Sequence, residues 1–398
     1  MRPAPTFPLA PNATIGIVGG GQLGRMSAMA AARLGYRCHV LTPEPDSPAA
    51  LVSAGVTLGD YEDPAALRAF AARVDVITFE CENVSAEGLD LLASLKPVRP
   101  APEVLRISQD RVSEKRFVNA CGIATAPWLP VETPAELAAA VQRLGLPAVL
   151  KTTRLGYDGK GQAILREPTD LGPVFASLGP KPLILEGFVD YAAEISVIVA
   201  RGTDGSDAAF DTVENRHRDH ILDLTLAPAP IAPALATEAR AIARRLAASL
   251  DLVGLLAVEM FIGPRGTVRV NEIAPRPHNS GHWTIDACPA SQFELHIRAV
   301  AGLPLPPAIR YADAVMKNLV GPEETALWPD ILATPGLIPH LYGKAEARRG
   351  RKMGHVTRLF PRGGLPGRFG LEAALGPLMR ARQNELGLHA ESAALEES

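Results

Sequence analysis

A glycine-rich turn between an apolar strand and an alanine-rich helix, near the start of the chain, constrains the fold most. Residues 14–36 read TIGIVGGGQLGRMSAMAAARLGY, and a second apolar segment follows at 38–45. A strand, a tight turn, a helix and a second strand form a βαβ unit, which places both strands parallel in one sheet. A third apolar segment, VDVITFECEN at 74–83, ends in acidic residues. The first part of the chain is therefore predicted to be an α/β domain.

The glycines of this turn, Gly19, Gly21 and Gly24, have the spacing of a dinucleotide-binding loop, in which helix amides hold a pyrophosphate. That fingerprint also requires an acid about 20 residues later for the ribose. Glu44 lies near this point but is flanked by prolines. Two interpretations therefore stay open: an NAD-dependent oxidoreductase, or a tight turn that holds another phosphate or none.

Length and composition exclude several classes of protein. At 398 residues the chain is expected to form two to three domains, and 47% hydrophobic with 21% charged residues is typical of a globular protein. The 40 basic and 43 acidic residues give a net charge of −3, which argues against a nucleic-acid binder. Four widely spaced cysteines, the lack of a signal peptide and the lack of a long apolar stretch predict a cytoplasmic protein with no membrane segment.

Three regions are expected, with boundaries at proline-rich or polar segments. The first is 1–107, the second is 108–305, and the third, 306–398, is β-rich and ends in an acidic tail. The second region has an α+β pattern of helices and antiparallel strands. Its expected helices are 108–123 and 237–250, and its expected strands lie within 147–165, 182–189, 193–200, 255–263 and 267–275.

The segment KTTRLGYDGKGQ, residues 151–162, is a glycine-rich connection between two expected strands. Glycine lets backbone amides approach phosphate oxygens, and Lys151 supplies a positive charge beside them. The segment is not a Walker A loop, because neither Ser nor Thr follows Gly159-Lys160. A solvated surface loop is the alternative.

Two glutamates lie within apolar strands that a short turn connects. An unpaired carboxylate is costly to bury there, so Glu259 and Glu272 need a cation or hydrogen-bond partners. Antiparallel pairing would place them side by side, and with Asn271 they would offer the oxygen ligands that Mg²⁺ prefers. The alternative is a salt bridge from each glutamate to Arg265 or Arg269.

Two further segments are rich in polar groups. RPHNSGHW at 276–283 could bind an anion or a heterocycle, and its proline and glycine favour a loop over a zinc-binding helix. The basic run KAEARRGRK at 344–352 has no interleaved aromatic residues, which favours a clamp for a small phosphate over an RNA surface. A solvated run of charges is the alternative for this segment.

Taken in order over residues 14–358, these segments resemble one family, the 5-(carboxyamino)imidazole ribonucleotide synthases of the ATP-grasp superfamily. The distinctive strings are NEIAPRPHNSGHWT and YGKAEARRGRKMGH, supported by GGGQLGRM, TFECEN and LKTTRLGYDGKGQ. The resemblance implies an ATP-grasp fold with a Rossmann-like N-terminal domain and a small β-rich C-terminal domain. It also implies carboxylation of 5-aminoimidazole ribonucleotide by bicarbonate and ATP through carboxyphosphate, with Mg²⁺, in a cytoplasmic homodimer.

The resemblance also implies roles for individual residues. Those expected to bind ATP are Arg111, Lys151, Gly156, Tyr157, Asp158, Gly159, Lys160, Gly161, Gln162, Glu186, Gly187, Phe188, Val189, Glu194, His217, Asn271 and Glu272. Those expected to bind the ribonucleotide or bicarbonate are Glu80, Tyr157, Asp158, Lys160, Arg276, His278, Asn279, Lys344 and Arg351. The implied catalytic residues are Arg276, His278, Asn279 and Lys160, and the implied Mg²⁺ ligands are Glu259 and Glu272.

Three alternatives make different predictions. A formate-dependent glycinamide ribonucleotide transformylase would share ATP and Mg²⁺ but use another amine. An NAD-dependent oxidoreductase would change the absorbance of NADH. A nucleotide-binding assembly protein would bind ATP and release no phosphate.

Overall fold

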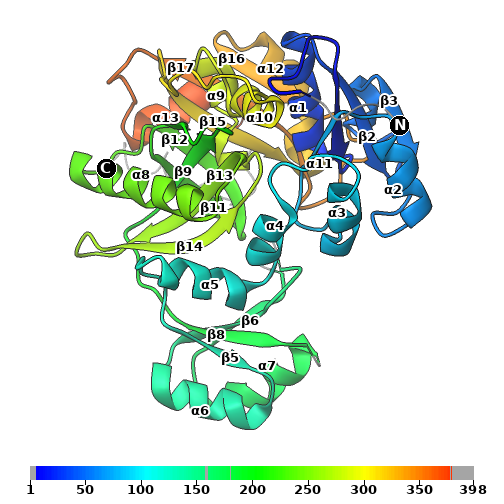
Figure 1. Cartoon of the computed structure of the whole chain (residues 1–398). Coiled ribbons are helices and arrows are strands. Elements are labelled where there is room, and N and C mark those ends of the chain that lie inside the picture. The colour runs from blue at the N-terminus through cyan, green and yellow to red at the C-terminus, as the bar shows by residue number, and fades with distance from the viewer. Residues whose placement is uncertain (1–5, 157–159, 180, 377, 379–398) are drawn as a thin grey trace, which may run out of the picture.

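The N-terminal residues form the predicted parallel sheet, with strand order β3-β2-β1-β4. The computed structural model describes residues 6–156, 160–179, 181–376 and 378 (Figure 1). The elements of this part are β1 (Thr14–Val18), α1 (Gln22–Arg33), β2 (Arg37–Thr42), β3 (Gly55–Leu58), α2 (Pro64–Ala71), β4 (Val76–Phe79) and α3 (Ala86–Ala93). Two helices, α4 (Pro102–Gln109) and α5 (Arg111–Ala120), lead to the next part, and the boundary predicted at residue 107 lies within α4.

A small antiparallel sheet, with strand order β5-β8-β6-β7, follows α5. Figure 1 shows it at the bottom of the molecule, covered by α6 and α7. The elements are β5 (Trp128–Val131), α6 (Pro134–Leu144), β6 (Ala148–Thr152), β7 (Gln162–Leu165), α7 (Leu171–Leu178) and β8 (Leu183–Gly187). The predicted hairpin is confirmed, because β6 and β7 pair antiparallel from Ala148–Leu165 to Lys151–Gln162.

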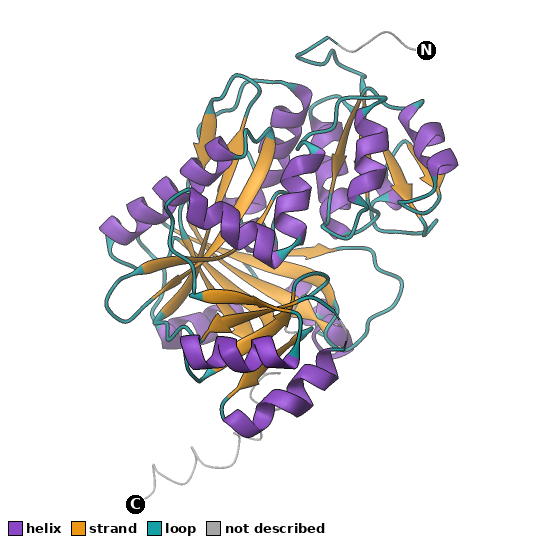
Figure 2. Ribbon diagram, turned by 60° about the horizontal axis from the view of Figure 1, so that its bottom comes forward, coloured by secondary structure: helices purple, strands orange, loops and turns teal. Residues whose placement is uncertain are grey.

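A nine-stranded antiparallel sheet forms the centre of the molecule, and Figure 2 shows its strands spread as a fan between helices. Its strand order is β14-β13-β9-β11-β12-β15-β17-β16, with β10 paired to β9. The strands up to β14, with their helices, are β9 (Ala193–Arg201), β10 (Asp207–Ala209), β11 (Val213–Arg218), β12 (Ile221–Ala227), α8 (Pro233–Ser249), β13 (Gly254–Ile262), β14 (Val268–Ala274), α9 (Thr284–Ala287) and α10 (Gln292–Ala301).

The C-terminal residues are β-rich, as predicted, and their strands extend the central sheet because β15 pairs with β12. The elements are β15 (Asp313–Val320), α11 (Gly321–Ala326), α12 (Trp328–Ala333), β16 (Leu337–Leu341), β17 (Lys352–Phe360) and α13 (Arg368–Leu375). The acidic tail lies outside the described residues beyond 378. The predicted division at residues 107 and 305 stays a prediction.

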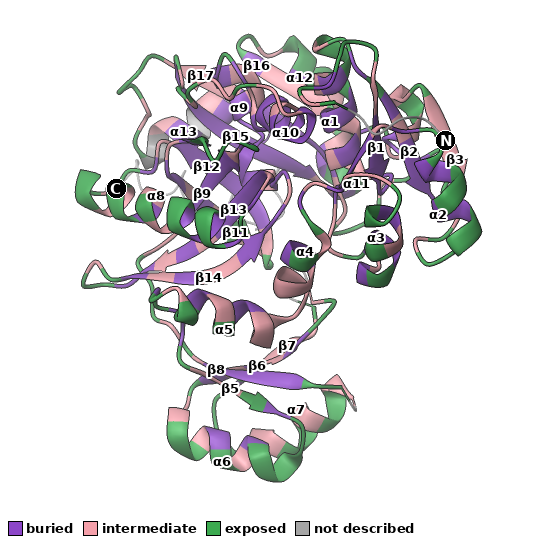
Figure 3. Cartoon of the chain, viewed as in Figure 1, coloured by how far each residue is buried: buried purple, intermediate pink, exposed green. Residues whose placement is uncertain are grey.

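Helix α10 packs between the N-terminal sheet and the central sheet. Figure 3 shows it buried, whereas the outer faces of α2, α6 and α8 are exposed. Its Ile297 and Val300 are fully buried in the same apolar cluster as Ile15 and Ile17 of β1. This shared core fixes the N-terminal part against the central sheet. Within the described residues, every helix is too short or too polar to cross a bilayer.

Candidate active site

The carboxylate of Glu80, just after β4, fills the glycine turn that begins α1. Its Oε1 accepts a hydrogen bond from the amide of Gly21, and its Oε2 accepts one from the amide of Gly24 at 2.6 Å. A Cβ at Gly19 would lie 2.4 Å from the Glu80 side chain, and one at Gly21 would lie 2.7 Å from it. The glycines thus leave space for the Glu80 carboxylate. It accepts hydrogen bonds from the amides that would otherwise bind a dinucleotide pyrophosphate.

Gly21→Ala is expected to destabilise the protein by about 1–3 kcal/mol, because the new methyl group would collide with the buried Glu80 carboxylate. Gly172→Ala in α7 is the matched control, since its Cβ would meet nothing within 4 Å and alanine favours a helix. Urea unfolding of both variants measures the difference in the free energy of unfolding. Equal stability of the two variants would contradict the close packing at the turn.

Charges from two other parts of the molecule influence the Glu80 carboxylate. Burial raises its pKa, and this is opposed by the two amide hydrogen bonds and by the positive charges of Arg276 and Lys344. Arg276 follows β14, and its Nε lies 2.7 Å from the Glu82 carboxylate of the N-terminal part. Lys344 follows β16. The charges of two residues predicted to bind the ribonucleotide, one after β14 and one after β16, therefore act on a third such residue in the N-terminal part.

A buried carboxylate between two lysines lies in the small sheet and α5. Glu186 Oε2 is 3.0 Å from Lys151 Nζ, and Glu186 Oε1 is 3.3 Å from Lys115 Nζ. Burial would raise the pKa of Glu186, but the two ammonium groups outweigh it and lower the pKa to about 2. Lys115 Nζ also donates to the backbone oxygen of Asn271 at 3.2 Å. The cluster thereby connects the small sheet with β14.

Arg111, at the start of α5, contacts two other predicted residues. Its Nη1 lies 3.3 Å from Glu272 Oε2, and its Nη2 donates to the carbonyl oxygen of Gly156 at 3.2 Å. Burial would lower the pKa of Arg111, but Glu272 and other carboxylates outweigh it and raise the pKa. Asp110 caps this helix through the amide of Ser113. The predicted phosphate-binding arginine therefore lies at the base of the glycine-rich loop.

Glu259 and Glu272 are direct partners across β13 and β14, as predicted. Glu259 Oε1 is 3.1 Å from His278 Nε2, and this contact outweighs burial to lower the pKa of Glu259. The salt bridges proposed as the alternative are not seen in the described residues: Glu272 pairs with Arg111, and Arg269 donates to Thr267. Two adjacent carboxylates offer hard oxygen donors, so the residues present fit Mg²⁺.

One small cavity adjoins these carboxylates and is lined by Glu194, His217, Glu259 and Asn271 among others. Glu194 Oε2 lies 2.5 Å from His217 Nδ1. Burial would lower the pKa of His217, but the hydrogen bond to Glu194 and its charge outweigh burial and raise the pKa. The predicted ribose residue Glu194 and the predicted metal ligand Glu259, which are distant in sequence, therefore line one cavity.

The loop after β14 is held by hydrogen bonds to the central sheet. His278 Nδ1 lies 2.8 Å from Ser280 Oγ, which lies 2.7 Å from Ser196 Oγ of β9. The amides of Asn279 and Asn318 bond to each other in both directions, at 2.9 and 2.8 Å. These contacts fix the orientation of the two predicted anion-binding side chains, His278 and Asn279.

The predicted phosphate clamp lines a cavity of about 330 Å³. Lys344 and Arg351 line it together with Glu44 and Asp46 of the N-terminal part. Lys344 Nζ donates to the backbone oxygen of Lys352 at 2.6 Å, and Arg351 Nη1 donates to that of Glu346 at 3.0 Å.

The remaining predicted residues fall into two groups. Tyr157, Asp158 and Gly159 lie outside the described residues. Described residues of the loop and of the segment after β8 are Lys160, Gly161, Gln162, Gly187, Phe188 and Val189. Phe188 is 47% exposed, which suits an apolar surface for a heterocycle.

Three residues of the site were not predicted. Lys115 lies one helical turn after Arg111, so a basic face on the expected helix could have indicated it. Asn318 is a polar residue within the apolar strand β15, the same signal that marked Glu259. Glu82 lies at the acidic end of the segment 74–83. No local sequence signal indicated that it would pair with Arg276.

Each of the three parts of the chain matches a known domain family. Residues 12–109 match the ribonucleotide synthetase preATP-grasp domain, residues 116–293 match the ATP-grasp domain, and residues 314–362 match the phosphoribosylaminoimidazole carboxylase C-terminal domain. The predicted ATP-grasp fold is therefore confirmed.

The individual relatives that follow are all named as the same synthase. The N5-carboxyaminoimidazole ribonucleotide synthase of Brucella melitensis is 51% identical over 356 residues, covering 89% of this chain and 98% of the relative. That of Bacillus subtilis is 44% identical, covering 87% and 91%. The crystal structure of the Aspergillus clavatus synthase in complex with ADP and 5-aminoimidazole ribonucleotide has a TM-score of 0.87 at 32% identity, covering 94% and 99%. The chain belongs to the N5-carboxyaminoimidazole ribonucleotide synthase family.

Proposed function

We propose that this ATP-grasp ligase carboxylates 5-aminoimidazole ribonucleotide with bicarbonate, consuming ATP and giving ADP and phosphate. The observation that carries the proposal is the ion pair, at 2.7 Å, between Arg276 after β14 and Glu82 of the N-terminal part, two residues from the buried Glu80. The Aspergillus clavatus relative, which was crystallised with ADP and 5-aminoimidazole ribonucleotide, supports both substrates. The reaction is a step of purine biosynthesis.

The nucleotide is proposed to lie between the small sheet and the central sheet. Lys151 and Arg111 are proposed to bind its phosphates, and the loop from Gly156 to Gln162 is proposed to cover them. The segment Glu186 to Val189 is proposed to follow the adenine, with Glu194 at the ribose and His217 beside it. The 2.5 Å contact between Glu194 and His217 supports this, because it fixes the carboxylate in one orientation.

Glu259 and Glu272 are proposed to hold Mg²⁺, with Asn271 beside them. A bound Mg²⁺ would neutralise charge on the phosphate oxygens during phosphoryl transfer. Arg111 and His278 already contact the two carboxylates and hold them in place without the ion. The pairing of the two residues across β13 and β14 supports the assignment.

Bicarbonate and carboxyphosphate are proposed to bind at Arg276, His278 and Asn279, with Lys160 of the loop closing over them. An arginine fork can neutralise the negative charge that develops on these anions. His278 Nδ1 accepts a hydrogen bond from the Ser280 amide at 3.3 Å, which leaves the proton on Nε2. The junction between the three parts would exclude water, which otherwise hydrolyses carboxyphosphate before the amine attacks.

The 5′-phosphate of the ribonucleotide is proposed to bind Lys344 and Arg351 in the cavity of about 330 Å³. Glu80, Tyr157 and Asp158 are proposed for the rest of the ribonucleotide. Lys344 lines the cavity, and its positive charge also acts on the buried Glu80 carboxylate, which supports one continuous site.

Phosphate release from Mg-ATP tests the proposal directly. Release is expected to depend on 5-aminoimidazole ribonucleotide and bicarbonate together, with a carboxylated ribonucleotide as product. Stimulation by glycinamide ribonucleotide and formate instead would overturn the substrate assignment. Binding of ATP without release under any combination would overturn the ligase activity.

A homodimer and a cytoplasmic location are proposed with this function. All four cysteines are described and unpaired, which suits a reducing compartment. Light scattering of the purified protein determines whether the chain forms a dimer.

A further inference from the structure

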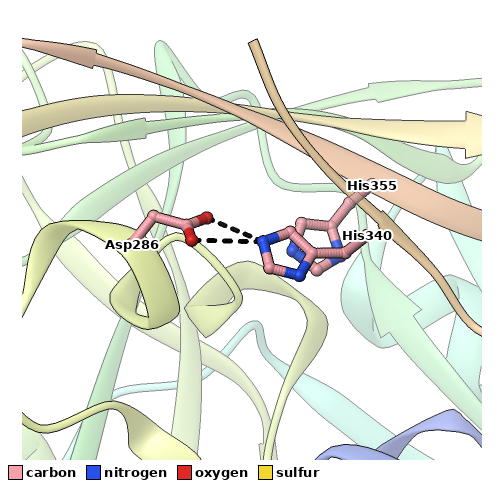
Figure 4. Close-up of side chains that lie close together, drawn as sticks. All are labelled: Asp286, His340 and His355. Carbon is pink, nitrogen blue, oxygen red and sulfur yellow. Dashed lines mark hydrogen bonds and ion pairs between the residues drawn. The ribbon is translucent and has the colours of Figure 1, made fainter. Parts of the chain in front are cut away.

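Three side chains outside the proposed catalytic residues converge from three different elements. Asp286 belongs to α9, His340 to β16 and His355 to β17. Each offers one oxygen or nitrogen atom within 4.8 Å of the other two. His340 Nε2 lies 2.9 Å from Asp286 Oδ2, and the rings of His340 and His355 stack at 4.4 Å (Figure 4).

His355 has one ring nitrogen fixed and the other free. Its Nδ1 lies 3.0 Å from the Tyr342 hydroxyl. Its Nε2 is fully buried and has no hydrogen-bond partner among the described residues. An unsatisfied buried polar atom is unfavourable, whereas an imidazole oriented through its other nitrogen is typical of metal ligands.

The surroundings keep the free nitrogen ready for a ligand. The His355 side chain is fully buried, so the fold holds this nitrogen away from bulk water. The His340 side chain is 25% exposed and that of Asp286 is 10% exposed, which gives an ion a route from solvent. The cluster thus combines a buried nitrogen donor with a partly accessible carboxylate.

We propose that Asp286, His340 and His355 bind a divalent transition-metal ion of the Zn²⁺ class, with a water molecule in the fourth position. Two imidazole nitrogens and one carboxylate oxygen are a common ligand set for zinc. His282 lies beside His355 but is not a ligand: the Gln292 amide donates to its Nδ1 at 3.1 Å, which leaves the proton on Nε2.

This ion differs in kind from the proposed Mg²⁺. Glu259 and Glu272 offer oxygen atoms alone, which favour Mg²⁺, whereas nitrogen donors favour transition metals. The proposed ion would connect α9, which follows the loop 276–283, to the two strands that flank the segment 342–351. It would therefore stabilise the framework of the site without contacting the reacting atoms.

Cobalt binding to the chelator-treated full chain, in excess Mg²⁺, tests the proposal. We expect one Co²⁺ per chain with the visible absorption bands of histidine-bound cobalt, displaced by Zn²⁺, and a rise in the unfolding temperature on binding. Asp286→Asn and His340→Gln are expected to lose the bands. The control His220→Gln, at an exposed turn, should keep them.

Two results would overturn the metal site. One is the absence of cobalt bands and of any Zn²⁺-dependent rise in unfolding temperature in the wild-type chain. The other is equal binding by the wild-type chain and Asp286→Asn, with both folded by circular dichroism. Because the readout is spectroscopic, either result leaves the proposed carboxylation reaction untouched.

Discussion

Glu272→Gln is expected to lower ATP turnover by about 10³-fold while the protein stays folded. Glutamine keeps the size of the side chain but removes one of the two charges proposed to hold Mg²⁺. Arg111 would also lose the partner that lies 3.3 Å away, so the phosphate-binding arginine would be less well positioned. Phosphate release measured over a range of Mg²⁺ concentrations gives the effect.

Glu214→Gln is the matched control for this variant. Glu214 lies in β11 of the same sheet, where it pairs with Arg216 at 2.6 Å, and it has no proposed part in the reaction. Its turnover should stay close to that of the wild-type chain. Unchanged turnover of Glu272→Gln at limiting Mg²⁺ would contradict the metal assignment.

Arg351→Ala is expected to raise the KM for the ribonucleotide by about 10- to 100-fold with little change in the KM for ATP. A hydrogen bond between charged groups contributes about 1.5–3 kcal/mol, which corresponds to this range. Arg351 lines the cavity of about 330 Å³, whereas Lys151 and Glu186, which are proposed for the nucleotide, are not among the residues that line it. Initial rates at varied concentrations of each substrate separate the two effects.

Arg348→Ala is the control within the same cavity. The guanidinium of Arg348 is already paired with Glu346 at 2.6 Å, and both side chains are more than 60% exposed, so its loss should change the KM by less than about 3-fold. An equal rise in both KM values for Arg351→Ala would argue against a clamp specific for the ribonucleotide.

The local sequence pattern was sufficient to predict the pairing of two strands that a short connection joins. The turn at 263–266 brings β13 and β14 together, so the sequence alone predicted that Glu259 and Glu272 lie side by side, and their pairing confirms it. The turn does not predict the register shift between Glu259 and Met260 that makes the two glutamates direct partners. The same logic gave the β6–β7 hairpin on either side of the glycine-rich loop. In both cases the contact joins residues close in sequence.

Pairing between distant segments could not be predicted in this way. β12 pairs with β15 although about 90 residues separate them, and neither strand carries a local signal for the other. The Glu80 carboxylate was predicted as a substrate-binding residue, but its hydrogen bonds to the amides of α1 depend on the register of β4 beside β1. Lys115 was missed because its partner Glu186 lies in another sheet.

The shared central sheet has a consequence for how two reactants are brought together. One continuous hydrogen-bonded ladder carries the residues proposed for the nucleotide on β9, β11, β13 and β14 and also the strands β16 and β17, which flank the proposed phosphate clamp. With substrates bound as proposed, their separation would be set when the chain folds. The translational entropy of aligning the amine with its acceptor is largely lost on binding, before the reaction begins, which raises the effective molarity of the amine.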